Sequence, residues 1–281
     1  MSDDPYTAFL QWVLPRLGKR WEGYRKVQNQ VESRLTDRLQ ELGLRSLDAY
    51  RDYLGAHPDE WNRLDAMTRI TVSRFYRDPE VFDCLRNEVL PAVAWEHFHD
   101  GDGPLRAWSV GAASSEEPYT LRILWRHVLR DRFEGRELQV TASEARAHML
   151  ERGRRGCYQR GTLTDLPESW IDRAFRYDPA LDAGEHAEPY CLRPVYRRHV
   201  TWRHEDIRTQ RPDGPFSLVC CRNLVFTYFN CSLQKRILRQ LLARLRPGGA
   251  LVLGTGESLP EPTESLVQIE ETLPLYRHRP L

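Results

Sequence analysis

Beyond residue 104, short apolar runs alternate with helical patterns, and this alternation limits the possible folds more than any other feature of the chain. The apolar runs are "LRAWSV", "LQVTA", "FSLVCC" and "ALVLG". Strands joined by crossover helices in this way are typical of a parallel sheet covered on both faces. Residues 98–281 are therefore predicted to form an α/β domain.

The first 97 residues show helical periodicity and no confident strand. Apolar residues from Trp21 to Leu42 recur at steps of three and four, which predicts an amphipathic helix that Gly43 ends. Further helical patterns run through "SLDAYRDYLGA", "DEWNRLDAMTRI" and "PEVFDCLRNEVLPAV". The turn-rich "HDGDGP" predicts a boundary near residues 98–104, after a helical N-terminal domain and linker over residues 1–97. Candidate N-caps precede three of the helical patterns: Ser46, Asp59 and Asp78.

The alternation of strands and helices is interrupted between residues 157 and 203. Short β-like pieces, "EPYCLRPVY" and "HVTW", occur there in place of a crossover helix. We therefore expect residues 157–203 to form a small inserted β-subdomain.

Charge and cysteine content limit the possible partners and the compartment. The chain has 41 Lys and Arg against 40 Asp and Glu, so no overall field attracts it to nucleic acid or to an anionic membrane. Six cysteines without C-x-x-C spacing predict reduced thiols in a cytosolic protein. The start "MSDDPYTAFL" lacks the pattern of a signal peptide, and no apolar run is long enough to span a bilayer. We expect a soluble, cytoplasmic protein without direct membrane insertion.

Polar residues follow the predicted strands at four places. Ligands of open parallel sheets bind beyond the carboxyl ends of the strands, so these residues are candidates for a binding site. They are Gly111 to Glu117, Ser143-Glu144, Glu205-Asp206 and Arg222-Asn223.

The first of these segments is a glycine turn that leads into a helix N-terminus, where free amide groups can face a ligand. It has one glycine, so it is not the G-x-G-x-x-G dinucleotide motif. Ser114 and Glu117 also have the spacing of a capping box, in which Glu117 would fold back onto its own helix. The pattern leaves both interpretations open.

Glu144 follows the second strand, where a carboxylate can accept hydrogen bonds from both hydroxyls of a ribose. Taken alone, it could equally cap the next helix. A glycine turn after the first strand and an acid after the second together predict a cofactor that contains a nucleoside. The nine histidines lack metal-ligand spacing such as H-E-x-x-H, so no metal is predicted.

Several segments in the same order identify a family. The segments "TRITVSRFYRDPEVFDCLRNEVLP", "LRAWSVGAASSEEPYTL", "TASEARAHMLERGRRGCY", "CRNLVFTYFN" and "LRPGGALVLGTGESL" are similar to motifs of the CheR-type, S-adenosylmethionine-dependent protein-glutamate O-methyltransferases of bacterial chemotaxis. The resemblance covers about residues 18 to 260. It implies a Rossmann-like methyltransferase sheet with a small β-subdomain insert, preceded by an all-α domain.

The resemblance also implies roles for individual residues. Thr71, Ser73 and Arg77 of the linker would close over the amino-acid end of S-adenosylmethionine, with Arg77 meeting its carboxylate. Glu117 would face the ammonium group beside the Gly111 turn. The remaining cofactor contacts would come from residues at later strand ends: Glu144 at the ribose, Asp206 and Ile207 at the adenine, and Arg222 and Asn223 below the methyl group. Tyr228 would lie near the transferred methyl, and it and Arg77 are the expected catalytic residues.

The chain departs from the family pattern at several of these positions. Serine stands at position 115, where the family has glycine, and arginine at 146, where a second aspartate is common. One extra residue separates Asn223 from Tyr228. Polar exchanges also occur at three cofactor positions: Thr71 for asparagine, Ser73 for threonine and Glu144 for aspartate.

The resemblance implies an acidic helical segment of a chemoreceptor-like protein as the partner. Arg34 and Arg38 lie four residues apart on one helical face and match the family's receptor-reading helix. A solvated charged face is the alternative. The β-subdomain docks a receptor tail in some members of the family. We expect a monomer, and two other functions stay open: methylation of another acceptor, or regulation by cofactor binding without turnover.

Overall fold

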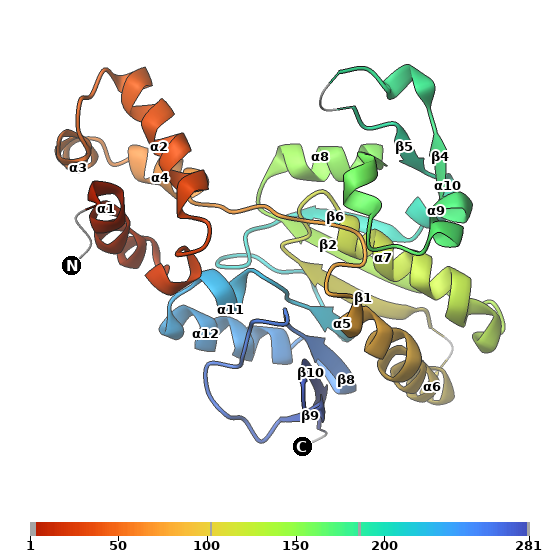
Figure 1. Ribbon diagram of the computed structural model, residues 1–281. Coiled ribbons are helices and arrows are strands. Elements are labelled where there is room, and N and C mark those ends of the chain that lie inside the picture. Colours follow the sequence, from red (N-terminus) through yellow and green to blue (C-terminus); the bar gives the residue numbers. More distant parts are fainter. Residues whose placement is uncertain (1–3, 102, 185–186, 280–281) are drawn as a thin grey trace. The chain divides into compact units, whose positions relative to one another are not determined.

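A computed structural model describes residues 4–101, 103–184 and 187–279. The chain forms two compact units, one of Met1–Val72 with Thr227–Gln234 and one of Ser73–Phe226 with Lys235–Leu281. Figure 1 traces both along the chain. The predicted boundary near residue 98 differs from the observed division after Val72. The reason is that the two helices after the linker bury Val81, Phe82 and Leu90 in the core of the second unit.

The first unit, here called the helical unit, contains α1 (Pro5–Val13), α2 (Gln28–Leu42), α3 (Leu47–Ala56) and α4 (Glu60–Met67). Their apolar faces share one core, which includes Leu10, Leu35 and Tyr50. Gly43 ends α2 in the left-handed conformation, with a φ of 66°, as the sequence predicts. Ser46 caps α3, whereas Asp59 makes no side-chain cap bond to α4.

Residues 21–27 were predicted to be helical, but α2 begins only at Gln28. A Cβ atom on Gly23 would lie 2.2 Å from the carbonyl oxygen of Thr227, so only glycine allows this approach of two backbones. Arg20 donates its backbone N–H to the Tyr228 carbonyl at 2.9 Å. Over residues 21–27 the backbone forms only a short 3-10 helix, at Trp21–Gly23, next to this later segment.

The second unit, here called the α/β unit, contains a seven-stranded sheet in the order β6-β2-β1-β7-β8-β10-β9. The first five strands in this order run parallel, and β10 is antiparallel to both of its neighbours. Chain order reverses between β1 and β7, so the loops after these strands flank the usual ligand position. The strands are β1 (Leu105–Val110), β2 (Leu138–Glu144), β6 (Val200–His204), β7 (Phe216–Cys220), β8 (Leu245–Val252), β9 (Leu266–Glu270) and β10 (Leu273–His278).

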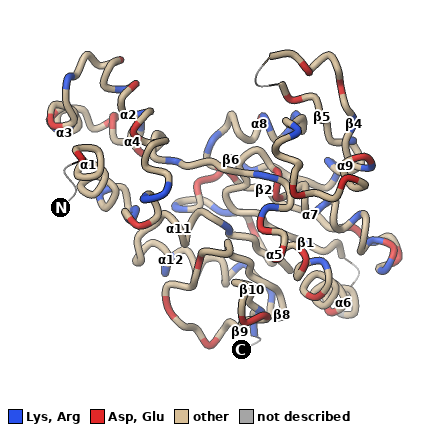
Figure 2. The backbone as a smooth tube through the Cα atoms, viewed as in Figure 1, with Lys and Arg blue, Asp and Glu red and all other residues tan. Residues whose placement is uncertain are grey.

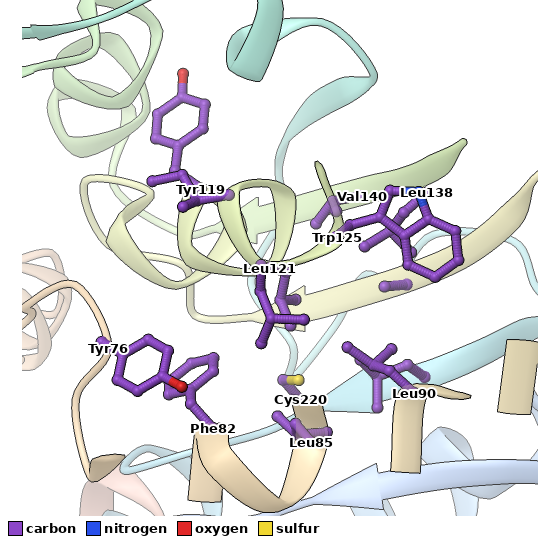
Figure 3. Packing of buried hydrophobic residues seen from close by; sticks show 14 of the residues in the cluster. Tyr76, Phe82, Leu85, Leu90, Tyr119, Leu121, Trp125, Leu138, Val140 and Cys220 are labelled. Atoms are coloured by element: carbon purple, nitrogen blue, oxygen red, sulfur yellow. The ribbon is translucent and has the colours of Figure 1, made fainter. Parts of the chain in front are cut away.

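Helices pack on the parallel strands and bury one continuous core. The helix α6 (Leu90–Asp100) contacts β1, β7 and β8, and α7 (Glu116–Leu124) and α8 (Ala147–Arg155) contact β2. In Figure 3, Leu121 of α7 extends toward Cys220 of β7 and Leu85, which follows α5 (Pro79–Cys84). Two further helices, α11 (Val225–Tyr228) and α12 (Cys231–Leu242), belong partly to each unit in sequence.

A second, three-stranded sheet has the order β3-β5-β4 and corresponds to the predicted insert. Its strands are β3 (Cys157–Tyr158), β4 (Phe175–Tyr177) and β5 (Tyr190–Leu192), and α9 (Glu168–Ala174) and α10 (Pro194–Arg197) accompany them. The predicted end of the insert at residue 203 is wrong, because Val200–His204 pairs in parallel with β2 of the main sheet.

The prediction of six reduced thiols is also wrong. Cys157 and Cys191 face each other across β3 and β5 and form a disulfide. They are 34 residues apart, so sequence spacing gave no sign of the pairing. The other four cysteines are free.

Among the described residues, no helix combines the length and the apolar character needed to cross a membrane.

Candidate functional site

The turn after β1 has a backbone that few sequences could adopt. Gly111 has a φ of 69°, and a Cβ atom there would lie 2.4 Å from a methyl group of Leu224. Ala113 and Ser115 also have positive φ values, of 48° and 71°. The Ala112 N–H donates to the carbonyl of Ser143 at 2.9 Å, which ties the turn to the end of β2. Such strained backbone is maintained only where surrounding contacts fix it, and it is concentrated at functional sites.

Backbone strain of this kind recurs around the carboxyl edge of the sheet. Among the described residues, seven non-glycine residues have positive φ, and five of them lie in the linker, the turn after β1 or the turn after β7. They are Tyr76, Asp78, Ala113, Ser115 and Asn223. The strain therefore points to the same edge as the polar strand ends.

Ser115, where the family resemblance implies glycine, is accommodated by two neighbours. Its hydroxyl accepts a hydrogen bond from the indole N–H of Trp202 at 3.2 Å. Gly153 of α8 leaves room for the side chain, because a Cβ at position 153 would lie 2.3 Å from the Ser115 oxygen. The Ser115 hydroxyl thus contacts β6 and α8, and the turn keeps its left-handed backbone conformation at this residue.

Glu144 ends β2 with a carboxylate that is 5% exposed. Its Oε2 accepts the backbone N–H of Ala113 at 2.9 Å. Its Oε1 accepts both the backbone N–H and the Nε of Arg146, at 3.1 and 2.9 Å. The second strand end therefore supports the turn after the first strand, and Arg146, where the family has an acid, neutralises the carboxylate.

Glu117 joins the end of β1 to the end of β7. Its Oε1 accepts the hydroxyl hydrogen of Ser109 at 2.6 Å, and its Oε2 accepts Nη1 of Arg222 at 3.2 Å. Ser114 bonds to Glu116 instead, at 2.6 Å. The capping-box interpretation of Ser114 and Glu117 is therefore wrong, and Glu117 belongs to the strand-end cluster.

Arg222 is the residue through which the linker meets the sheet. Its side chain is 4% exposed, and Nη2 donates to the Arg77 carbonyl and to Oδ2 of Asp78, both at 2.7 Å. The guanidinium also lies 4.9 Å from the ring centroid of Phe82. Asp78 was predicted as an N-cap, but it makes no cap bond and pairs with Arg222. One arginine thus fixes the linker turn, whose Arg77 side chain is half-buried.

The remaining predicted residues of the α/β unit lie near the same edge. Asp206 follows β6 and accepts Nη2 of Arg208 at 2.6 Å, while its neighbour Ile207 is buried. Ser73, in the linker, is half-buried. Burial raises the pKa of Glu116, and hydrogen bonds from Ser114 and Ser73 oppose that rise.

Thr71 and Tyr228 belong to the helical unit, so the structure does not place them with the strand-end cluster. Tyr228 packs against Tyr24 of the same unit, with ring centroids 5.1 Å apart. The expected position of Tyr228 beside the transferred methyl stays a prediction.

Arg34 and Arg38 make contacts within the helical unit. Arg38 forms a two-pronged pair with Glu60, through Nε at 2.9 Å and Nη2 at 2.7 Å, and also bonds to Glu41. Arg34 donates to the carbonyls of Met67 and Arg69, at 2.9 and 2.8 Å. These contacts join α2 to α4 and the segment after it. Recognition of an acidic helix by this pair stays a prediction, and the structure gives both guanidinium groups another role.

Charge at the site is local and balanced. Figure 2 shows acidic and basic residues interspersed along the backbone. Within the part of the chain that the structure describes, no cluster of His, Cys, Asp and Glu has the arrangement of a metal site. The strand ends instead offer carboxylates, which suit an ammonium group and ribose hydroxyls, and backbone amides at a helix start.

Four residues that support the cluster were not identified from the sequence: Ser109, Asp78, Arg146 and Glu257. Glu257 is 7% exposed and accepts the backbone N–H of Asn223 at 2.8 Å. Its sequence signal was its place in "GTGESL", shortly after a predicted strand end. The signal for Asp78 was its place directly after Arg77, which was read as a helix cap.

Comparison with known proteins identifies the family of the chain. Residues 71–273 match the family model of the CheR methyltransferase SAM-binding domain, and residues 6–68 match that of the CheR methyltransferase all-alpha domain. A chemotaxis protein methyltransferase of Listeria monocytogenes is 29% identical over 71% of this chain and 70% of its own. One from Escherichia coli is 27% identical over 92% and 85%, and one from Pseudomonas putida is 30% identical over 82% of each.

Proposed function

The chain belongs to the CheR methyltransferase family and carries its S-adenosylmethionine-binding domain, and we propose that it methylates a glutamate side chain of a chemoreceptor-like protein. The observation that carries this proposal is the cluster at the switch point of the sheet. Two carboxylates lie there: Glu117 in the first turn of α7, which follows the strained turn after β1, and Glu144 at the end of β2.

The cofactor fits this cluster by the chemistry of its groups. Glu144 can accept hydrogen bonds from ribose hydroxyls, as strand-end acids do in nucleoside sites. Glu117 supplies negative charge for the ammonium group of the cofactor's amino-acid end. Arg77 would neutralise the carboxylate of that end, with Ser73 beside it and Asp206 and Ile207 at the adenine.

S-adenosylmethionine supplies a methyl group on a sulfonium, and transfer to a carboxylate is an in-line displacement. A glutamate is already ionised at neutral pH, so the protein needs no general base for this reaction. Its residues must orient the two reactants and exclude water, and orientation alone can contribute about 7–11 kcal/mol. Arg222 and Asn223, fixed at the end of β7, would perform part of this positioning, and Tyr228 would act beside the methyl group.

The family supports a proposal for the acceptor and the location. The relatives are chemotaxis protein methyltransferases, so we propose a helical receptor segment as the substrate and the cytoplasm as the compartment. We also propose that the protein acts as a monomer. In the reducing cytoplasm the Cys157–Cys191 pair could be oxidised or reduced. Thiol counting on the purified protein distinguishes the disulfide from two free thiols.

The cofactor part of the proposal is tested by calorimetry with S-adenosylhomocysteine. Glu144→Ala should weaken binding by about 1.5–3 kcal/mol, because hydrogen bonds to a charged acceptor are lost. Glu151→Ala is the matched control, since Glu151 is an exposed acid of α8 that pairs with Arg154. Unchanged affinity in Glu144→Ala would remove this residue from the site.

The acceptor is tested separately, by incubating the protein with labelled cofactor and a chemoreceptor signalling fragment. A base-labile methyl ester on the fragment supports glutamate methylation. Tight cofactor binding without any labelled product would instead favour a regulatory protein without turnover. The additional residue before Tyr228 is the feature that makes this second function worth testing.

A further inference from the structure

Glu257 lies three residues after Gly254, just beyond β8, and is 7% exposed. One of its carboxylate oxygens, Oε2, accepts the backbone N–H of Asn223 and that of Gly254, both at 2.8 Å. The backbone N–H of Glu257 itself donates to the Gly254 carbonyl, also at 2.8 Å. A single buried oxygen therefore joins the turn after β7 to the turn after β8.

Asn223 is a residue whose conformation requires such support. Its φ is 55°, in the left-handed region that non-glycine residues rarely occupy. Its side chain is also restricted, because a Cβ atom on Gly254 would lie 2.7 Å from the Asn223 Oδ1. The backbone of Asn223 is thus held by Glu257, and its carboxamide lies against the bare Cα of Gly254.

The acceptor oxygen of Glu257 matters for this arrangement. A buried backbone N–H that loses its acceptor costs about 1–3 kcal/mol. If the carboxylate were removed, both amide donors would remain in a region that water reaches poorly, and the turn would relax from its left-handed conformation. The backbone position of Arg222, which is adjacent to Asn223, would then no longer be fixed.

We propose that Glu257 is a positioning residue for the cofactor site, which sets the conformation of Asn223 and through it the place of Arg222. The proposal rests on the proposed function, in which these two residues lie below the cofactor's methyl group. It adds β8 to the strands that define the site, beside β1, β2 and β7. Glu257 would act through the backbone of Asn223 and not by touching the cofactor.

The test compares Glu257→Ala and Glu257→Gln with Glu137→Gln. Glu137 directly precedes β2, at the opposite edge of the sheet, and binds Arg122 and Arg130, so it is a half-buried structural acid away from the carboxyl ends of the strands. S-adenosylhomocysteine affinity is measured by calorimetry, and stability by thermal unfolding, for each variant and the wild type.

We expect Glu257→Ala to weaken S-adenosylhomocysteine binding at least about tenfold, which corresponds to about 1.4 kcal/mol. Glu257→Gln keeps an oxygen that can accept both amide hydrogens, so it should recover affinity to within about threefold of the wild type. Glu137→Gln should lower the unfolding temperature and leave affinity unchanged. If Glu257→Ala does not fold, Glu257→Asp takes its place, because the shorter side chain cannot reach both amides. The Glu257→Asp protein should then bind S-adenosylhomocysteine more weakly than the Glu257→Gln protein.

Two results would overturn the proposal. If Glu257→Ala, or Glu257→Asp in its place, binds as tightly as the wild type while unfolding at a lower temperature, Glu257 is only structural. If affinity falls equally in Glu257→Gln and Glu257→Ala, the acceptor oxygen is not what positions Asn223. Failure of the wild type itself to bind S-adenosylhomocysteine would be a different result, because it overturns the proposed function together with this inference.

Discussion

Two arginines, one in each unit, use the same side chain in different ways. Arg38 directs two of its nitrogens at a single carboxylate, Glu60, in a pair whose members are 17% and 7% exposed. Arg222 is 4% exposed and divides its donors among three partners, Arg77, Asp78 and Glu117, which belong to two segments that are far apart in the sequence. Arg38, with two nitrogens on one carboxylate, holds two helices together. Arg222, with its nitrogens on several partners, fixes several loops at one point.

Their remaining hydrogen-bonding capacity differs in the same way. Hydrogen bonds to Glu60 and Glu41 raise the pKa of Arg38, and its Nε is paired. The Nε of Arg222 is buried and has no hydrogen-bond partner in the structure. Native proteins rarely leave a buried donor unpaired, and the exceptions call for a functional explanation. The comparison favours a structural role for Arg38 and supports the proposed role of Arg222 at the site.

Arg222→Ala should have the largest effect, on stability and cofactor binding together. Removing the buried guanidinium takes away three charged or carbonyl hydrogen bonds and leaves the half-buried acids Asp78 and Glu117 without their shared partner, which should cost about 3–5 kcal/mol of unfolding free energy. S-adenosylhomocysteine affinity should fall more than tenfold. Urea unfolding and calorimetry measure the two effects, and Arg222→Lys, which keeps the charge but not the planar group, should restore stability better than affinity. Wild-type affinity in both variants would break the comparison.

Arg38→Ala should lower the unfolding free energy by about 2–3 kcal/mol, because Glu60 would stay buried after losing two charged hydrogen bonds. Cofactor affinity should not change, since the contacts of Arg38 lie within the helical unit. Urea unfolding with calorimetry on the same sample checks both statements. A variant of normal stability that no longer methylates a receptor fragment would restore the prediction of a substrate-reading face.

Arg34→Ala should have a smaller effect, of about 1–2 kcal/mol. Arg34 donates to two neutral backbone carbonyls, of Met67 and Arg69, and leaves no buried charge when it is removed. Thermal unfolding of the single variants, measured side by side, should therefore rank Arg38→Ala below Arg34→Ala in stability. The reverse order would mean that the carbonyl contacts hold α2 in place more firmly than the ion pair.

The smallest effect should appear as a pH dependence. The hydrogen bond from Arg38 is the main cause that lowers the pKa of Glu60 below 4.5, with a smaller contribution from Tyr50. A lowered carboxyl pKa gives stability that is present above the unfolded value and is lost as pH falls through the folded value. The stability difference between wild type and Glu60→Gln should therefore shrink below about pH 4.5. A difference that stays constant down to pH 3 would show that Glu60 is not ionised in the pair.

The sequence predicted the parallel sheet well, because alternation of strands and helices determines on which edge the strand ends meet. Glu117, Glu144 and Arg222 were expected at one edge for this reason, and the structure brings them together there, while their contact with a cofactor stays a prediction. The unit boundary was misplaced because the periodicity of residues 79–100 indicates an amphipathic helix and not which core that helix enters. The strand at Val200–His204 was assigned to the wrong sheet because a short strand carries no signal of its partner.

Contacts between residues distant in the sequence were the least predictable. Arg34 and Arg38 have the spacing of a surface stripe, and nothing in their neighbourhood indicates that Glu60, 22 residues later, closes the pair. Glu257 acts on backbone amides, which every residue has, so no side-chain pattern could reveal its target. The disulfide joins cysteines whose strands pair only in the folded chain.

The return of the chain to the helical unit at residues 227–234 affects how the protein is made. Backbone contacts of Lys19 and Arg20 with Phe229 and Tyr228 complete this unit, yet those partners are synthesised long after its four helices. At 5–20 residues per second, the ribosome needs roughly 10–30 s to cover the interval from residue 72 to residue 234. During that time the helical unit lacks residues 227–234, while the strands of the sheet are synthesised. We expect a chaperone that binds nascent chains to bind the apolar surface that the incomplete helical unit exposes.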